Sequence, residues 1–178
     1  RSYKVAVTFV PTGTDTATPG LINGSFEEPA VGTFTVFAGI NDIPGWTITQ
    51  GQVEIDRTPW PAAAGSQSMD LSGAVAGSLE QSVSGFEPGA RYAFSLSYAL
   101  HASAVNAREA DVLIDGVVVE TLLAGPEIKA PNYQTARIEF TAPADGQVTF
   151  GFVSLSTDSK GVVVDNLGIT LVQQTPQP

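Results

Sequence analysis

Several residue types that carry enzyme chemistry are missing or scarce in the 178-residue chain. Cysteine is absent, which excludes a disulfide framework, a thiol nucleophile and a zinc site with thiolate ligands. The single histidine, His101, lies in a polar stretch after a predicted strand, and no Gly-x-Ser-x-Gly element accompanies it. Gly-rich motifs that bind phosphates or dinucleotides are also absent. These absences indicate that the chain is not an enzyme.

Basic residues are few, and no long hydrophobic run occurs. The chain has 8 Lys and Arg residues against 18 Asp and Glu residues, which gives a formal net charge of −10. Binding to a nucleic-acid backbone or to anionic lipid needs clustered cations, so neither is an expected partner. No apolar run approaches the roughly 20 residues of a membrane-spanning helix, so no membrane insertion is expected. The acidic excess fits a soluble extracellular protein or one that binds cations.

Short runs of β-branched and aromatic residues alternate with turn signals along most of the chain. Hydrophobic residues make up 43% of the composition, and 18 Gly and 12 Pro residues interrupt the runs. Runs at roughly ten-residue spacing are typical of β-sandwiches, and Asp115-Gly116 marks a hairpin. The predicted fold is all-β, an antiparallel β-sandwich of the jelly-roll type. Strands are predicted at 21–27, 33–38, 44–49, 52–56, 67–72, 78–83, 91–99, 109–114, 117–123, 134–141, 147–153 and 162–171.

The same patterns predict the domain limits and the core. The sandwich is expected to span 21–172. An N-terminal extension, 1–20, combines a strand at 3–10 with a turn-rich linker, and 173–178 begin a second linker. The start at Arg1 and the terminal linker lead us to expect neighbouring domains of a larger chain. The residues expected in the core are Phe26, Trp46, Leu71, Phe94, Leu96, Ile114, Phe140, Phe150 and Val164.

One pair of acidic residues and one single acidic residue are candidates for a catalytic or metal-binding role. Glu54 and Asp56 are two residues apart, so a strand places both on one face. Such a pair fits a glycosidase, which needs two acids, but also a cation site or a solvated strand face. Asp165 follows three valines, and near a buried strand an unpaired carboxylate is costly. Either Ca²⁺, which prefers oxygen ligands, or backbone hydrogen bonds made by Asp165 and Asn166 in a turn would relieve that cost.

Aromatic residues in stiff loops are candidates for sugar binding, because their rings stack on the apolar face of a sugar. Trp60 lies between Pro59 and Pro61, which restrict the backbone, and Tyr133 lies in another turn-rich stretch. An exposed Trp60 would provide a stacking surface, and core packing is the alternative. Trp46 is predicted in the core. The polar side chains considered as partners of sugar hydroxyl groups are Arg57, His101, Asn106 and Arg108.

A series of motifs follows the order seen in a known domain family. The chain resembles the galactose-binding-like jelly-roll domains shared by plant cell-wall proteins of unassigned function and bacterial "choice-of-anchor C" surface proteins. The plant members carry cysteines that are absent here, so the chain is closer to the bacterial members. The motifs, which cover 21–171, are LINGSFEEP, IPGWTI, GQVEID, PAAAGSQSMDLSG, LEQSV, GARYAFSLSYAL, VLIDGVVVETL and GVVVDNLGI.

The resemblance implies a non-catalytic module of a secreted or cell-surface protein that binds a cell-wall or extracellular polysaccharide. It also implies a structural Ca²⁺ that joins the first strand to the last, with Glu27 and Asp165 as side-chain ligands. Backbone carbonyls near Ser25 and in the loop 57–66 would complete the coordination. The alternative is a structural module of a bacterial surface adhesin, which spaces neighbouring domains and binds no sugar.

Overall fold

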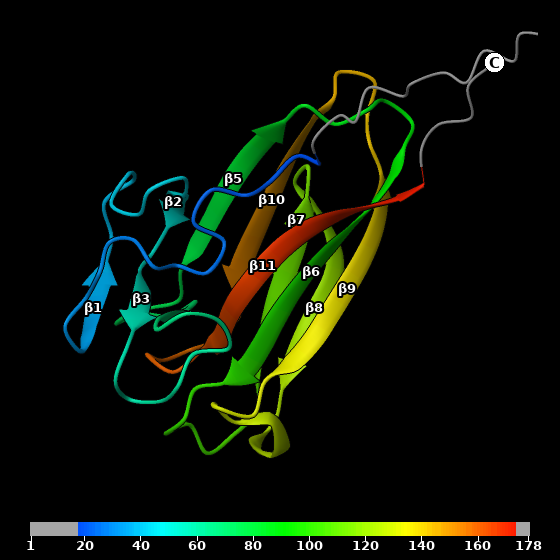
Figure 1. The fold of residues 1–178 in the computed structure, drawn as a ribbon. Coiled ribbons are helices and arrows are strands. Elements are labelled where there is room, and N and C mark those ends of the chain that lie inside the picture. The colour runs from blue at the N-terminus through cyan, green and yellow to red at the C-terminus, as the bar shows by residue number, and fades with distance from the viewer. Residues whose placement is uncertain (1–17, 174–178) are drawn as a thin grey trace, which may run out of the picture.

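The computed structural model describes residues 18–173 and contains two antiparallel sheets (Figure 1). The strand order is β1-β3-β4-β11-β6-β9 in the six-stranded sheet and β2-β5-β10-β7-β8 in the five-stranded sheet. The predicted all-β sandwich is therefore confirmed. The elements are β1 (Phe34–Phe37), β2 (Thr47–Gln50), β3 (Val53–Asp56), β4 (Ser68–Asp70), β5 (Ser78–Ser84), β6 (Arg91–Leu100), β7 (Arg108–Ile114), β8 (Val117–Ala124), the short 3-10 helix η1 (Pro126–Ile128), β9 (Gln134–Thr141), β10 (Gln147–Ser154) and β11 (Val162–Gln173). Within 18–173, no helix is long and apolar enough to cross a membrane.

Predicted and observed strands agree closely, with one exception. The strand expected at 3–10 and most of both linkers lie outside the described residues. Each other predicted run overlaps an observed strand, but 21–27 forms turns instead. Asn23 and Phe26 have positive φ angles of 54° and 53°, and the Asn23 side chain hydrogen-bonds with the backbone of Glu28. Because Asn tolerates the left-handed region and bonds its own backbone neighbours, local polar contacts outweigh the strand pattern here.

The two sheets pack face to face, and their inner faces supply the core. In Figure 1, β11 and β6 of one sheet lie in front of β10 and β7 of the other. Aromatic rings meet between the layers, and the ring centroids of Phe94 and Phe150 are 4.7 Å apart. The residues predicted in the core are buried, except that Phe140 is only half-buried on β9. β9 is an edge strand, and a neighbour on one side only leaves more of its side chains in solvent.

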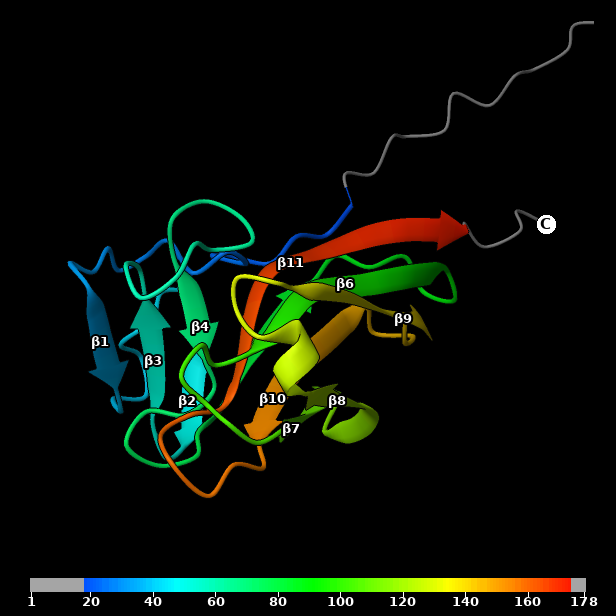
Figure 2. The same cartoon turned by 90° about the horizontal axis from the view of Figure 1, so that it is seen from below.

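The strand β11 is buried on both faces of its first half. It lies between β4 and β6, as Figure 2 also shows. Because side chains alternate along a strand, Val164 joins the core whereas Val163 and Asp165 lie on the outer face of the six-stranded sheet. The loop 57–67, which joins β3 to β4, covers part of this outer face, and its Trp60 packs against Val163. The uncovered remainder of this face carries the pocket described below.

This core predicts a large effect of the substitution Phe150→Ala. The ring of Phe150 is fully buried, so its removal should lower the free energy of unfolding by about 3–5 kcal/mol in urea titrations. The control Val117→Ala alters a side chain that is 64% exposed and should change it by less than about 0.5 kcal/mol. A Phe150→Ala protein as stable as the control would contradict this packing.

Candidate functional site

A pocket of about 490 Å³ opens on the outer face of the six-stranded sheet. It lies where β1 and β3 meet the loop 57–67, the loop after β6 and the loop before β11. We refer to it as the outer-face pocket. Its lining residues are Phe34, Glu54, Asp56, Pro59, Trp60, His101, Ala102, Ser103, Ser159 and Lys160. It combines apolar rings with acidic, basic and hydroxyl groups.

An acid cluster, formed by Glu54, Asp56 and Asp70, lies at and behind the pocket wall. Strand register places Glu54 opposite Asp70 and Asp56 opposite Phe34, so these side chains share the outer face. The Asp70 carboxylate accepts hydrogen bonds from the Ser72 amide at 2.8 Å and the Gly161 amide at 3.0 Å. Asp56 is 2% exposed, and its Oδ2 has no hydrogen-bond partner among the described residues.

Gly161 is required for this contact with Asp70. A Cβ atom at Gly161 would lie 2.5 Å from Asp70 Oδ1, so a larger residue would push the two segments apart. The contact therefore fixes the start of β11 against β4. Ser159 and Lys160, which come just before Gly161, are held at the pocket rim by the same bond.

Burial shifts the ionisation of the acid cluster strongly. It raises the pKa of Asp56 to about 8, and the charge of Glu54 adds to this shift. Burial also raises the pKa of Glu54. Burial raises the pKa of Asp70 well above its usual range, against the effect of its two amide hydrogen bonds. Because burial and the charge of Glu54 both raise the pKa of Asp56, the pair favours the state in which one of the two carboxyl groups carries a proton.

The prediction that Trp60 presents an exposed stacking surface is wrong. The side chain is 5% exposed, packs with Ala99 and Val163, and donates from its indole Nε1 to Ser68 Oγ at 3.0 Å. The stiff loop around Trp60 folds back onto the sheet, because Val163 and Ala99 offer an apolar outer face to cover. Core packing, the alternative reading of this residue, is correct, and little of the ring reaches the pocket.

His101 lies beside Trp60, at a ring-centroid distance of 4.9 Å in an edge-on arrangement. Its Nδ1 accepts a hydrogen bond from the Ser103 amide at 3.1 Å, which leaves Nε2 as the proton-bearing nitrogen of a neutral ring. Burial and the charge of Lys160 lower the pKa of His101. The imidazole is therefore neutral at pH 7 and can donate one hydrogen bond into the pocket.

The other predicted sugar ligands are dispersed. Tyr133 is half-buried in the same small cluster as Trp60, and burial raises its pKa to about 12. Arg57 donates to the Val31 carbonyl at 3.2 Å, outside the pocket lining. Asn106 is exposed and its carbonyl accepts from Arg108, which pairs with Asp158.

Sequence reasoning missed several members of the pocket. Phe34, which is 55% exposed on the edge strand β1, supplies the accessible ring. Ser103, Ser159 and Lys160 come from loops that no local pattern links to β3. The paired spacing of Glu54 and Asp56 and the candidates Trp60 and His101 are the sequence signals that point to this site.

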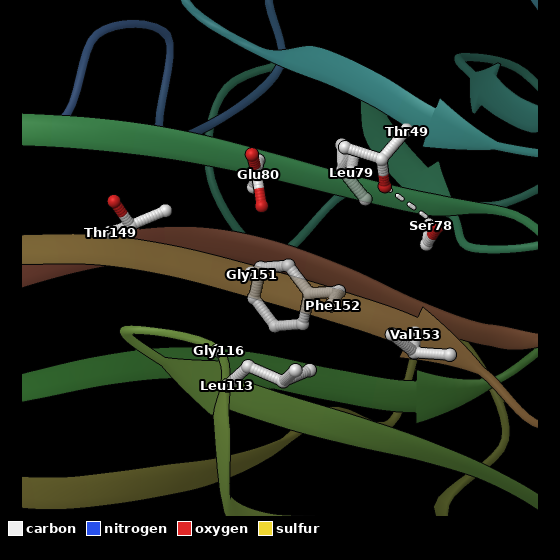
Figure 3. A pocket seen from close by; sticks show the side chains of 10 residues that line it. All are labelled: Thr49, Ser78, Leu79, Glu80, Leu113, Gly116, Thr149, Gly151, Phe152 and Val153. Atoms are coloured by element: carbon white, nitrogen blue, oxygen red, sulfur yellow. Dashed lines mark hydrogen bonds between the residues drawn. The ribbon is translucent and has the colours of Figure 1, made fainter.

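A second depression lies on the outer face of the five-stranded sheet (Figure 3). Gly151 lacks a side chain between Glu80 and Leu113, and this leaves a hollow of about 40 Å³. Thr49 and Ser78 hydrogen-bond to each other at its edge. The hollow has room for little more than bound water, and its one ring, Phe152, is fully buried in the core. It is not a candidate ligand site.

The predicted calcium ligands Glu27 and Asp165 both face the loop 57–67. Glu27 accepts from the amide and hydroxyl of Ser66 at 2.8 Å each, and from the Gln67 amide at 2.9 Å. Partial burial of Glu27 acts to raise its pKa, but these hydrogen bonds outweigh that effect and lower the pKa of Glu27. Asp165 accepts from the Ala64 amide at 2.8 Å and from the Asn166 amide at 2.6 Å. The backbone bonds considered as an alternative to calcium are thus present.

The same two carboxylates also repel each other. Burial, together with the charge of Glu27, raises the pKa of Asp165 to about 6. Ser25 lies half-buried in the turn before Phe26. Across residues 18–173, no group of three or more His, Asp or Glu side chains is arranged to hold a metal. Any ion here would depend on backbone carbonyls and water besides these two carboxylates.

The family described as "Protein of unknown function (DUF642)" matches residues 20–170. The chain belongs to the DUF642 family. The resemblance to a domain family of unassigned function is thereby confirmed. Halomucin from Haloquadratum walsbyi (strain DSM 16790 / HBSQ001) is 31% identical over 159 residues, which are 85% of this chain and 2% of halomucin. The DUF642 domain thus spans a very small part of this relative.

Two solved structures share the fold of this DUF642 domain. A family 35 carbohydrate-binding module from an environmental isolate has a TM-score of 0.53 at 20% identity, covering 79% of this chain and 99% of that one. The cyclase FisC from Fischerella sp. TAU has a TM-score of 0.60 at 14% identity, covering 89% and 98%. The fold therefore carries both a binding module and a cyclase, so function has to be argued from the site.

The acid cluster predicts that the stability of the fold decreases as pH rises from about 4 to about 8. In the unfolded chain Asp56 ionises near its ordinary value of 3.8, whereas in the folded domain it keeps its proton until about pH 8. Folded stability contributed by Asp56 is therefore complete below about pH 4 and lost progressively towards pH 8. Asp165, with a pKa of about 6, adds a loss between pH 4 and 6. His101 acts in the opposite direction, because its pKa is lowered.

Urea titrations at pH 5 and pH 8 test this prediction with Asp56→Asn. The substitution should raise the free energy of unfolding at pH 8 by about 1–3 kcal/mol and flatten the pH dependence. Asp111→Asn, on the five-stranded sheet, removes a carboxyl outside the cluster and should leave the pH dependence as in the unsubstituted chain. Equal pH dependence in all three proteins would contradict the assignment.

Proposed function

We propose that this DUF642 domain is a non-catalytic carbohydrate-binding module of a secreted or cell-surface protein. It binds a cell-wall or extracellular polysaccharide in the outer-face pocket. The observation that carries the proposal is the combination of an exposed ring, Phe34, with groups that pair with sugar hydroxyls. The Glu54 carboxylate accepts hydrogen bonds from sugar hydroxyl groups, while Lys160 and the neutral His101 donate hydrogen bonds to sugar oxygens.

Phe34 replaces Trp60 as the stacking surface in this proposal. A sugar ring covering a patch of about 60 Å² on Phe34 gains on the order of 1.5 kcal/mol. Such a contact supports weak binding per module, and avidity follows where modules are repeated or linked on one chain. The likeness to a small segment of halomucin supports a module within a very long chain. The likeness to a family 35 carbohydrate-binding module supports the same function.

The geometry of Glu54 and Asp56 argues against glycoside hydrolysis. Hydrolysis needs two carboxyl groups at least about 5 Å apart, on either side of the glycosidic bond. Here the two acids are two residues apart on one strand and point to the same face of the sheet, so they do not stand on either side of a glycosidic bond. The pair is suited to holding a ligand rather than cleaving it.

Calcium is proposed as a structural ion between Glu27 and Asp165. The donor set is of oxygen only, which suits Ca²⁺. A carboxylate has about four lone-pair positions; amide and hydroxyl donors take three at Glu27 and two at Asp165. The remaining positions, with backbone carbonyls near Ser25 and in the loop 57–66, would bind the ion. Bound calcium would neutralise the repulsion between the two carboxylates.

Thermal unfolding with and without a chelator tests the calcium proposal. An ion that binds only the folded state at a hundredfold excess over Kd should stabilise it by roughly 2.7 kcal/mol. The substitution Glu27→Gln should abolish this response, whereas Glu28→Gln, at the exposed neighbouring position, should retain it. Identical melting curves in calcium and in chelator would remove calcium from the proposal and leave sugar binding untouched.

A screen of the 178-residue chain on immobilised plant, algal and bacterial polysaccharides tests sugar binding. Phe34→Ala should reduce affinity for the retained polysaccharide about tenfold, since it removes the stacking surface. Val117→Ala, an exposed aliphatic residue on β8, is the control and should bind as the unsubstituted chain does. Retention that is unaffected by Phe34→Ala would exclude the outer-face pocket, and no retention on any polysaccharide would favour the structural-module alternative.

A further inference from the structure

Acidic groups outnumber basic groups in and behind the lining of the outer-face pocket. Three carboxyl groups, Glu54, Asp56 and Asp70, stand against a single ammonium group, Lys160. The chain as a whole carries a net charge of −10. A protein with this net negative charge draws in cations and repels anions. The ligand should therefore not be a polyanion.

Asp56 is the residue that most needs a partner. It lines the pocket, is 2% exposed, and its Oδ2 has no hydrogen-bond partner among the described residues. Asp70 and Asp165, which are equally buried, each accept at least two amide hydrogen bonds. A buried acceptor without a donor costs on the order of 1–3 kcal/mol. A ligand that brings a donor to Asp56 recovers this cost on binding.

We propose that the outer-face pocket selects glycans that present a protonated primary amine, such as hexosamine units without an N-acetyl group. This inference rests on the proposed sugar-binding function and names its ligand class. An ammonium group has three donors and a full charge, which suit the Glu54 and Asp56 carboxyl groups. The exposed ring of Phe34, which lies opposite Asp56 in the strand register, adds a cation–π contact.

Several other titratable groups face the pair. Asp70 on β4 lies behind it, Tyr133 before β9 is uncharged, and His101 after β6 is neutral. Lys160 before β11 is the one cation in the lining. In the free pocket the pair shares one proton, so its single negative charge balances Lys160. Once an ammonium ligand displaces that proton, the two carboxylates balance Lys160 and the ligand together. A uronate would add a negative charge to this lining.

Binding of the amine has a defined proton balance. The free pair holds one proton between Glu54 and Asp56, and the ligand enters as an ammonium ion. When the ammonium group takes the position of the shared proton, up to one proton leaves the protein for the buffer. Titration calorimetry in buffers of different ionisation enthalpy measures this release directly.

Calorimetry on the full chain at pH 6, where the amines of a glucosamine oligomer are mostly protonated, tests the proposal with three hexasaccharides. The ligands are a glucosamine oligomer, its N-acetylated form and a galacturonate oligomer, all at the same ionic strength and the same free calcium concentration. The glucosamine oligomer should bind at least about tenfold more tightly than the N-acetylated form, with proton release. The galacturonate oligomer should bind most weakly.

Two variants separate pocket recognition from general charge attraction. Asp56→Asn should abolish both the preference for the amine and the proton release, whereas Asp111→Asn changes the net charge equally and should retain both. Equal binding of the amine and N-acetyl forms, reduced by Phe34→Ala, would overturn the inference while the sugar-binding function stands. A preference that persists in Asp56→Asn would also overturn it. Failure of the chain to bind any polysaccharide would overturn both proposals.

Discussion

The burial of carboxylates on the outer face of the six-stranded sheet is the constraint on which the rest of the structure depends. Asp56, Asp70 and Asp165 are almost inaccessible to solvent, and a buried carboxyl must be protonated or given donors. Asp165 receives one donor from the loop 57–67, and Asp70 receives one from Gly161. The loops that wall the pocket are thus held in place by the acids they cover.

The three buried acids differ in how many hydrogen-bond donors they receive. This difference distinguishes the acids that hold the fold together from the one that is available to a ligand. Asp70 and Asp165 accept backbone amides and join distant segments of the chain. Asp56, by contrast, has Glu54 as its partner and an oxygen without a donor, at the wall of a pocket. Sites that bind ligands commonly retain such local instability, because satisfying it within the fold would remove the gain on binding.

The two tryptophans are both buried, but they pack in different layers of the structure. Trp46 packs against Phe26 and Phe152 in the core between the sheets. Trp60 instead seals the outer face, with its indole N–H satisfied by Ser68. Because the Trp60 ring is buried, the stiff loop offers no accessible aromatic surface. That surface lies on the edge strand β1, where Phe34 supplies it. The stacking surface is consequently set by strand pairing between β1 and β3.

The sequence by itself determined the strands, the sandwich and most of the core, because period-two alternation and turn residues act locally. It also determined that Glu54 and Asp56 share a face. It failed at 21–27, where side-chain bonds of Asn23 favour turns, and at Trp60, whose burial depends on a distant valine. Only the tertiary structure decided the pocket, because its walls come from β1, β3 and loops brought together by β4–β11 pairing. Pairing between distant strands depends on the whole sheet, and no local pattern encodes it.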